Sequence, residues 1–114
     1  MPEPTMLSTR SGRVLAEHLR WARTPAARRR GLLGAPQLEA GEALVIAGAP
    51  QVHTFGMRYP IDVLFCSSDW TVLHVVHSMK PRRVSRWVRR ARYAVEMPAG
   101  AAAGVKRGDV LELR

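Results

Sequence analysis

The residues best suited to chemistry lie in one run near the middle of the chain, His53 to Phe65, which reads HTFGMRYPIDVLF. The run places an imidazole, a carboxylate, a thioether and aromatic rings in apolar, strand-like surroundings. Ionisable groups are costly to bury unless another group pairs with them. The run therefore indicates where a site could lie, but it does not specify a reaction.

Asp62 is the first candidate, because residues 61–66 are mostly apolar on both alternating faces. Such a pattern predicts a central strand with a partly buried carboxylate. A buried carboxylate needs hydrogen-bond donors. Asp62 is then either a ligand-binding or catalytic group, or a structural acceptor that ties down the connection at residues 58–60.

Four further side chains could join Asp62 around a small ligand. His53, Phe55 and Met57 share a face if residues 52–58 are extended, and such a set can line a pocket. His53 could equally be an internal histidine that bonds to a carbonyl. Glu96 is either a solvent-facing carboxylate or a group that converges with His53 and Asp62, which would suit acid–base work or a hard divalent ion. No ligand spacing demands a metal, so we predict none, and the sequence names no cofactor.

A second candidate site is the basic segment 80–92, which lies in a stretch without acidic residues between Asp69 and Glu96. Cations that follow phosphates and aromatic rings that stack on bases suit single-stranded nucleic acid. A solvated face, an anionic membrane and an acidic protein surface are the alternatives. The candidate nucleic-acid-binding residues are Lys80, Arg82, Arg83, Arg86, Trp87, Arg89, Arg90 and Arg92.

The local structure of this segment has two interpretations. Val84, Trp87, Val88 and Ala91 recur at helical spacing among arginines, which is typical of a basic amphipathic helix. The same residues could form a loop whose apolar side chains cover one end of the fold.

The remaining pattern predicts a mainly β domain, a sandwich or jelly-roll-like barrel of about seven short strands with one or two short helices. The expected strands are 13–22, 43–47, 52–58, 61–66, 71–77, 92–97 and 110–113. Thr24 and Pro25 predict the start of a helix that runs from Ala26 to Leu33, with Gly34 as its cap. A brief helical turn is expected before Gly104.

Size and composition fit one soluble globular unit. The chain has 114 residues, 46% of them hydrophobic, and a net charge of +9 that favours polyanionic partners. We expect a flexible tail over residues 1–12, a single domain over 13–114, no transmembrane segment, a cytoplasmic location and a monomer or weak dimer. The single cysteine, Cys66, is expected to be buried and inert.

Four blocks of the sequence, taken in order, resemble the domain of unknown function 192 family of prokaryotes. They are RGLLG at 30–34, the central run at 53–65, ARYAVEMPAG at 91–100 and GVKRGDV at 104–110. The resemblance implies a compact sandwich or jelly-roll domain without an established activity. It points to His53, Phe55, Met57, Pro60, Asp62, Glu96 and Gly100, whereas the arginine-dense stretch 82–90 is not a feature of the family.

Three functions remain open from the sequence. The first is a small binding or accessory module with a pocket near His53 and Asp62 for a small ligand or a protein partner. The second is a nucleic-acid-binding module that uses segment 80–92. The third is an acid–base or metal-dependent enzyme, which no nucleophile motif or metal spacing supports.

Overall fold

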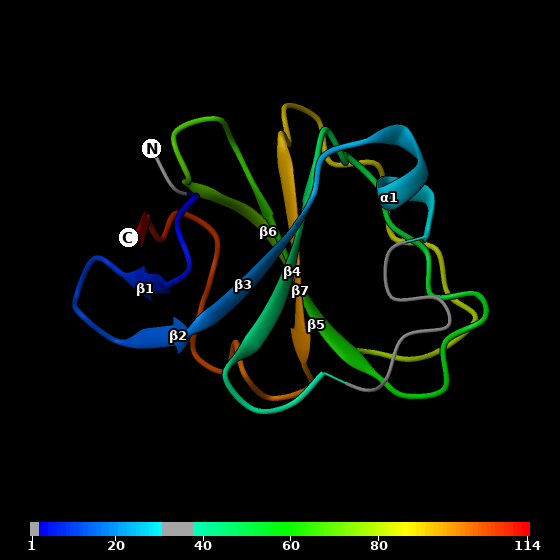
Figure 1. Ribbon diagram of the computed structural model, residues 1–114, viewed down its shortest axis with the longest axis horizontal. Coiled ribbons are helices and arrows are strands. Elements are labelled where there is room, and N and C mark those ends of the chain that lie inside the picture. The colour runs from blue at the N-terminus through cyan, green and yellow to red at the C-terminus, as the bar shows by residue number, and fades with distance from the viewer. Residues whose placement is uncertain (1–2, 31–37) are drawn as a thin grey trace.

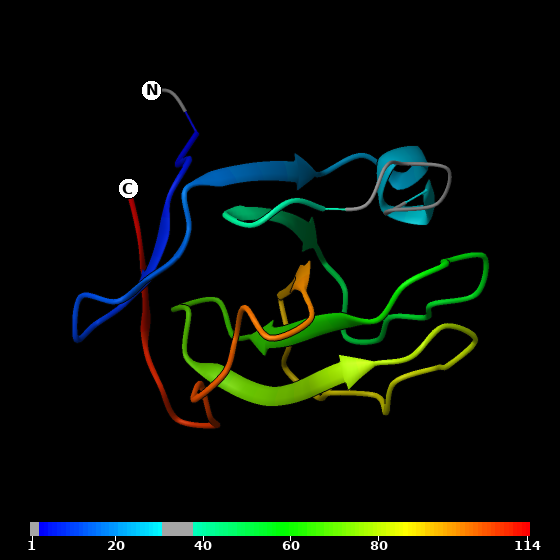
Figure 2. The same ribbon diagram turned by 90° about the horizontal axis from the view of Figure 1, so that it is seen from below.

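The computed structural model describes residues 3–30 and 38–114 and confirms a mainly β fold with one short helix. In chain order the elements are β1 (Leu7–Thr9), β2 (Val14–Ala16), β3 (His18–Ala22), α1 (Pro25–Arg30), β4 (Glu42–Ala47), β5 (Ile61–Cys66), β6 (Val72–Met79), β7 (Tyr93–Pro98) and β8 (Leu111–Leu113). The strands form a three-stranded sheet of order β2-β1-β8 and a five-stranded sheet of order β3-β4-β7-β5-β6. The small sheet lies at the end of the molecule that carries both termini, and α1 lies at the opposite end (Figures 1 and 2).

Two hydrophobic clusters cover the two faces of the five-stranded sheet. The first lies toward the small sheet and includes Leu7, Leu64 and Val95. The second includes Ile61, Val63 and Phe65, and it packs under the segments that follow β4 and β6. Because both faces are covered, every residue of β5 is buried, as the apolar character of both faces of 61–66 predicts.

The N-terminal region departs from the sequence prediction in two ways. Residues 7–9 belong to the fold rather than to a tail, since β1 pairs with both β2 and β8 and Leu7 is fully buried. The single strand predicted over 13–22 is two strands, β2 and β3, in different sheets. The chain changes sheet at Glu17, the residue that interrupts the apolar face of this stretch, and its amide bonds to the Gly41 carbonyl at 2.8 Å.

The helix begins as predicted, with Thr24 as its cap: the Thr24 hydroxyl accepts a hydrogen bond from the Ala27 amide at 3.1 Å. The helix is described as far as Arg30, and the predicted continuation to Leu33 with its cap at Gly34 lies outside the described residues. No helical turn precedes Gly104. Residues 98–105 instead form successive turns, in which the amides of Ala101, Ala103 and Val105 bond to carbonyls three residues earlier.

Two predicted elements between strands are corrected. Residues 52–58 are a loop and not a strand, because the chain turns at Gly56, whose φ is +85°. Of the two structures predicted for segment 80–91, the loop is observed and the helix is not. The segment is an irregular stretch that is joined to the 50–54 loop by a β-bridge between His53 and Val84. These paired loops cover the second hydrophobic cluster through Val52 and Val88.

Candidate functional site

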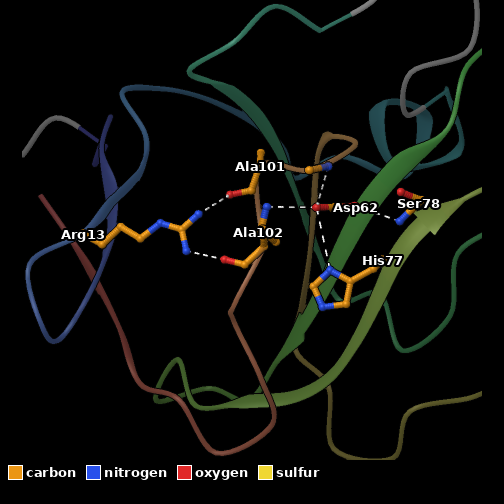
Figure 3. Close-up of polar contacts among 8 residues, drawn as sticks. Arg13, Asp62, His77, Ser78, Ala101 and Ala102 are labelled. Carbon is orange, nitrogen blue, oxygen red and sulfur yellow. Dashed lines mark hydrogen bonds and ion pairs between the residues drawn. The ribbon is translucent and has the colours of Figure 1, made fainter.

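Asp62 is a fully buried carboxylate that accepts three backbone hydrogen bonds (Figure 3). One oxygen, Oδ1, accepts from the Ser78 amide at 2.8 Å. The other, Oδ2, accepts from the amides of Gly100 and Ala102 at 3.0 and 2.9 Å. Asp62 is thus a structural acceptor, which is one of its two predicted roles. Its hydrogen bonds connect β5 to the end of β6 and to the turn after β7, and not to residues 58–60 as predicted.

The turn that Asp62 holds is also held from its other side by Arg13. The Arg13 guanidinium donates from Nη2 to the Ala101 carbonyl at 3.2 Å and from Nη1 to the Ala103 carbonyl. The sticks in Figure 3 place the turn between the two side chains. A cation therefore bonds to the carbonyls of this turn and an anion to its amides, which is the favourable sense for both charges.

The Asp62 bond to the Ser78 amide coincides with an unusual backbone conformation. Ser78 has a φ of +51°, a left-handed conformation that costs a non-glycine residue about 1 kcal/mol or more. It lies where the pairing of β5 with β6 shifts register between Ile61 and Val63. A charge-assisted hydrogen bond offsets that cost and fixes the bulge at the end of β6.

His77 is the one ionisable side chain found close to Asp62 among the described residues. Its Nδ1 lies 3.9 Å from Asp62 Oδ2, and its side chain is 50% exposed. The sequence analysis did not single out His77 and missed this approach. The signal was weak, because 15 residues separate His77 from Asp62 and only the β5–β6 pairing brings them together.

Glu96 lies on the opposite face of the sheet from Asp62. In the pairing of β5 with β7, Glu96 is opposite Val63 while Asp62 is opposite Met97, and cross-strand partners point to the same face. The expectation of a solvent-facing Glu96 is wrong, since the residue is only 3% exposed. Burial raises the pKa of Glu96 to about 7.

Tyr59 is the ionisable neighbour of Glu96 on this face. Burial raises the pKa of Tyr59, a backbone hydrogen bond with Leu38 lowers it, and the charge of Glu96 raises it further. The two groups therefore lie within electrostatic reach of each other, on the side of the sheet away from Asp62.

The other predicted ligand-binding residues lie on the loop at 52–58, outside the strands that carry the two carboxylates. His53 is exposed on the loop that bridges to Val84, and its ring centroid is 5.8 Å from that of Phe55. Met57 is half-buried against the second hydrophobic cluster. The single pocket predicted around His53, Phe55, Met57, Asp62 and Glu96 is therefore corrected: the five residues are divided between the two faces of the sheet and a surface loop.

Thr54 anchors the basic segment and was not singled out in the sequence. Its side chain is fully buried, and its hydroxyl donates to the Lys80 carbonyl at 2.6 Å and accepts from the Arg83 amide at 2.9 Å. Backbone bonds join Thr54 to Arg82 and Arg83 as well. The only signal in the sequence was a hydroxyl between His53 and Phe55 in the central run.

The basic segment keeps its charged side chains at the surface. All of its lysine and arginine residues are exposed: Lys80, Arg82, Arg83, Arg86, Arg89, Arg90 and Arg92. Trp87 is 63% exposed among them, while Ser85, Val88 and Ala91 face inward. Ser85 fixes the middle of the segment, because its hydroxyl accepts from the Val52 amide at 3.0 Å and its amide donates to the Val52 carbonyl at 2.9 Å.

A groove of about 500 Å³ lies between the end of β6 and residues 83–86. Its lining combines apolar with cationic side chains, namely Val76, Met79, Val84, Lys80, Arg83 and Arg86. This combination suits an anionic ligand that also has an apolar part.

Two further expectations concern metal and thiol chemistry. Within residues 3–30 and 38–114, no group of three or more histidine, cysteine or acidic side chains could hold a metal ion. Cys66 is buried as expected, and burial raises the pKa of its thiol to about 12, which disfavours the reactive thiolate. In the same part of the chain, no helix is both long and apolar enough to cross a membrane.

The fold and these contacts define a small two-sheet β domain whose turns are fixed by a buried carboxylate. The chain belongs to the DUF192 family, described as "Uncharacterized ACR, COG1430", whose model matches residues 6–113. No functionally curated protein shows significant similarity to it.

Two solved structures share the fold. A protein of unknown function from Novosphingobium aromaticivorans is 24% identical, with a TM-score of 0.80 over 96% of this chain and 83% of its own. A protein from Sinorhizobium meliloti, described as "a putative transcription regulator", is 27% identical, with a TM-score of 0.78 over 97% of this chain and 92% of its own.

Proposed function

We propose that this domain is a binding module that takes up single-stranded nucleic acid on segment 80–92. The observation that carries the proposal is the fixed backbone of this segment together with the exposure of its cationic side chains. The segment is an extended loop, fixed to the 50–54 loop by hydrogen bonds, and it presents seven exposed cations around an exposed tryptophan. Cations track the phosphates of a single strand, and flat side chains stack on its bases.

The loop is ordered before any ligand binds, which lowers the entropy that binding would cost. Thr54 holds residues 80–83, Ser85 bonds to Val52, and the Val88 amide bonds to the Pro50 carbonyl at 2.8 Å. The arginine side chains therefore project from a fixed backbone. Within the described residues, none of the cations of this segment forms an ion pair, so their charge is available to phosphates.

Flat side chains lie on the same pair of loops. Trp87 is 63% exposed and Phe55 is 51% exposed, and the Phe55 ring lies beside that of His53. The His53 to Val84 bridge joins the loop that carries these rings to the basic segment. Large exposed rings surrounded by arginine are favourable for base stacking rather than for charge neutralisation alone.

The description of the Sinorhizobium meliloti protein as "a putative transcription regulator" agrees with a role in nucleic-acid binding. The small-ligand hypothesis loses its main support, since its five residues do not share a pocket. The enzyme hypothesis pairs His53 with Asp62 or Glu96, and His53 lies on an exposed loop whereas both carboxylates are buried in the sheet.

The test is the binding of a fluorescently labelled oligo-deoxythymidine to the full chain over a salt series. We expect affinity to fall steeply with salt, because bound cations displace counterions from the strand. Replacing Arg86, Arg89 and Arg90 with glutamine should make the slope of log K against log salt less steep by about 2, at about 0.7 for each phosphate that is no longer neutralised. Trp87→Ala should weaken binding at all salt concentrations, by about 1 kcal/mol or more if one base stacks on it.

The matched control replaces Arg10, Arg20 and Arg114, which are exposed outside this segment, with glutamine. It lowers the net charge by the same amount and should leave the slope nearly unchanged. An equal loss in both triple variants would show that binding depends on net charge alone and would reject the proposed surface. Absence of binding at low salt would reject the function itself.

A further inference from the structure

Among residues 3–30 and 38–114, no strand pairs with the outer edge of β6 over most of its length. β6 is the last strand in the order of the five-stranded sheet. Only its start is covered, where the Val72 amide bonds to the Asp109 carbonyl and the Gly108 amide to the Val72 carbonyl, both at 2.8 Å. In the described part of the chain, no backbone bond outside the β5 pairing reaches residues 73–77. Such an edge directs alternate amides and carbonyls outward, where another strand can bind them.

Residues 73–77, Leu-His-Val-Val-His, lack several of the devices that usually protect an edge, although a register shift lies toward each end of the stretch. They contain no lysine, no arginine, no acidic residue and no proline. The register of β6 against β5 shifts only toward the two ends, between Ile61 and Val63 and between Phe65 and Cys66. The stretch opposite Val63, Leu64 and Phe65 is therefore regular enough to accept a strand.

The groove between β6 and residues 83–86 borders the end of this edge. Its apolar lining, Val76, Met79 and Val84, can accept alternate side chains of an extended segment. Lys80, Arg83 and Arg86 line the same groove and would meet acidic side chains of that segment.

The charge around the edge decides between two kinds of added strand. Burial lowers the pKa of His74 in β6, and the charges of Arg86 and Arg107 lower it further, so two cations lie within electrostatic reach of the edge. A second copy of this chain, paired through its own β6, would bring these cations together. An acidic strand would neutralise them, since opposite charges stabilise a paired strand and like charges destabilise it.

We propose that the edge of β6 and the adjoining groove bind an extended acidic segment of a partner protein, which adds to the five-stranded sheet as a sixth strand. Backbone bonds to residues 73–77 would supply the alignment. Lys80, Arg83 and Arg86 would select glutamate or aspartate at alternate positions of the partner. This surface differs from the nucleic-acid surface around Trp87, Arg89 and Arg90, although the two share Lys80, Arg83 and Arg86.

The experiment uses the full chain and two short labelled peptides of equal length and charge. One alternates glutamate with valine, and the other alternates glutamate with proline, which cannot donate to a ladder. We expect the glutamate–valine peptide to bind at least about tenfold more tightly, equivalent to about 1.4 kcal/mol. Amide hydrogen exchange of residues 73–77 should slow only when that peptide is bound.

Side-chain variants separate this surface from the nucleic-acid surface. Replacing Lys80 and Arg83 with glutamine should weaken the glutamate–valine peptide by about tenfold or more, whereas replacing Arg89 and Arg90 should leave its affinity unchanged. All four side chains are exposed, so the variants are expected to fold.

Several outcomes would overturn the proposal. Equal affinity for the two peptides would show that only charge is recognised, and unchanged exchange at 73–77 would exclude strand addition. Protection of these amides by oligo-deoxythymidine but not by peptide would assign the edge to nucleic acid. A concentration-dependent dimer of the free chain that protects the same amides would assign the edge to a second copy.

Discussion

Asp62 and Arg13 bind opposite ends of the same peptide unit. The Ala102 amide donates to Asp62 Oδ2 at 2.9 Å, and the Ala101 carbonyl accepts from Arg13 Nη2 at 3.2 Å. Each charge polarises the peptide group in the sense that strengthens the bond at the other end. The turn at 100–104 thus couples β5, in the large sheet, to the residue that precedes β2 in the small sheet.

This arrangement makes Asp62 a stabilising residue whose loss should cost the fold more than the loss of a surface acid. In Asp62→Asn the new amide group places donors opposite backbone donors, so at least one buried amide loses its acceptor. We expect the free energy of unfolding to fall by about 2–3 kcal/mol, measured by urea denaturation. Asp69→Asn, at an exposed turn, is the matched control and should cost much less.

The coupling through the peptide can be measured directly. Arg13→Gln alone should cost about 1 kcal/mol, because two hydrogen bonds to an exposed guanidinium are replaced in part by water. In a double-mutant cycle with Asp62→Asn, the combined loss should be smaller than the sum of the single losses. Strict additivity would show that the two side chains act on the turn independently.

Local pattern was sufficient to predict the strands with the strongest alternation. Residues 61–66 form β5 with the predicted bounds, because an apolar strand bounded by proline and a serine-rich turn has few other options. The cap at Thr24 was equally local. The strand predicted at 52–58 failed because the loop is closed by the Thr54 hydroxyl and by a positive φ at Gly56, and neither changes the apolar pattern.

The candidate site could not be assembled from the sequence, because its contacts are long-range. The three amides on Asp62 come from residues 16, 38 and 40 positions further along the chain. No periodicity within one strand carries that information. The interpretation of Glu96 as a solvent-facing carboxylate failed, because loops distant in sequence cover that face of the sheet.

Glu96 should make the stability of the protein depend on pH near neutrality. Its carboxyl has a pKa of about 7 in the folded state, against 4.5 as the reference value. Between these values the folded state retains a proton that the unfolded state has lost, so stability falls as the pH rises from about 4.5 to 7 and then levels off. The full effect is about 3 kcal/mol, since each pKa unit corresponds to 1.36 kcal/mol.

Glu96→Gln removes this titration and should be more stable than the parent chain above pH 7. The measurement is the free energy of unfolding in urea at several pH values between 4 and 8. Glu112→Gln, at an exposed position of β8, is the control and should follow the parent curve. A parallel pH dependence in Glu96→Gln and the parent would show that Glu96 does not cause the decline.

Thr54→Val tests whether the basic segment depends on the hydroxyl that anchors it. Valine keeps the shape of threonine but cannot bond to the Lys80 carbonyl or the Arg83 amide. A loss of two buried bonds should lower the free energy of unfolding by about 1–3 kcal/mol and should speed amide exchange at residues 82–85. Thr5→Val, at an exposed position, is the matched control.

Thr54→Val also distinguishes binding that depends on the order of the loop from binding that depends on net charge alone. If the arginines act from an ordered loop, Thr54→Val should weaken oligo-deoxythymidine binding although it changes no charge, because the loop must then be ordered during binding. The salt slope should change little, since the same phosphates are neutralised. Unchanged affinity in a variant with faster exchange at 82–85 would show that the order of the loop contributes nothing to binding.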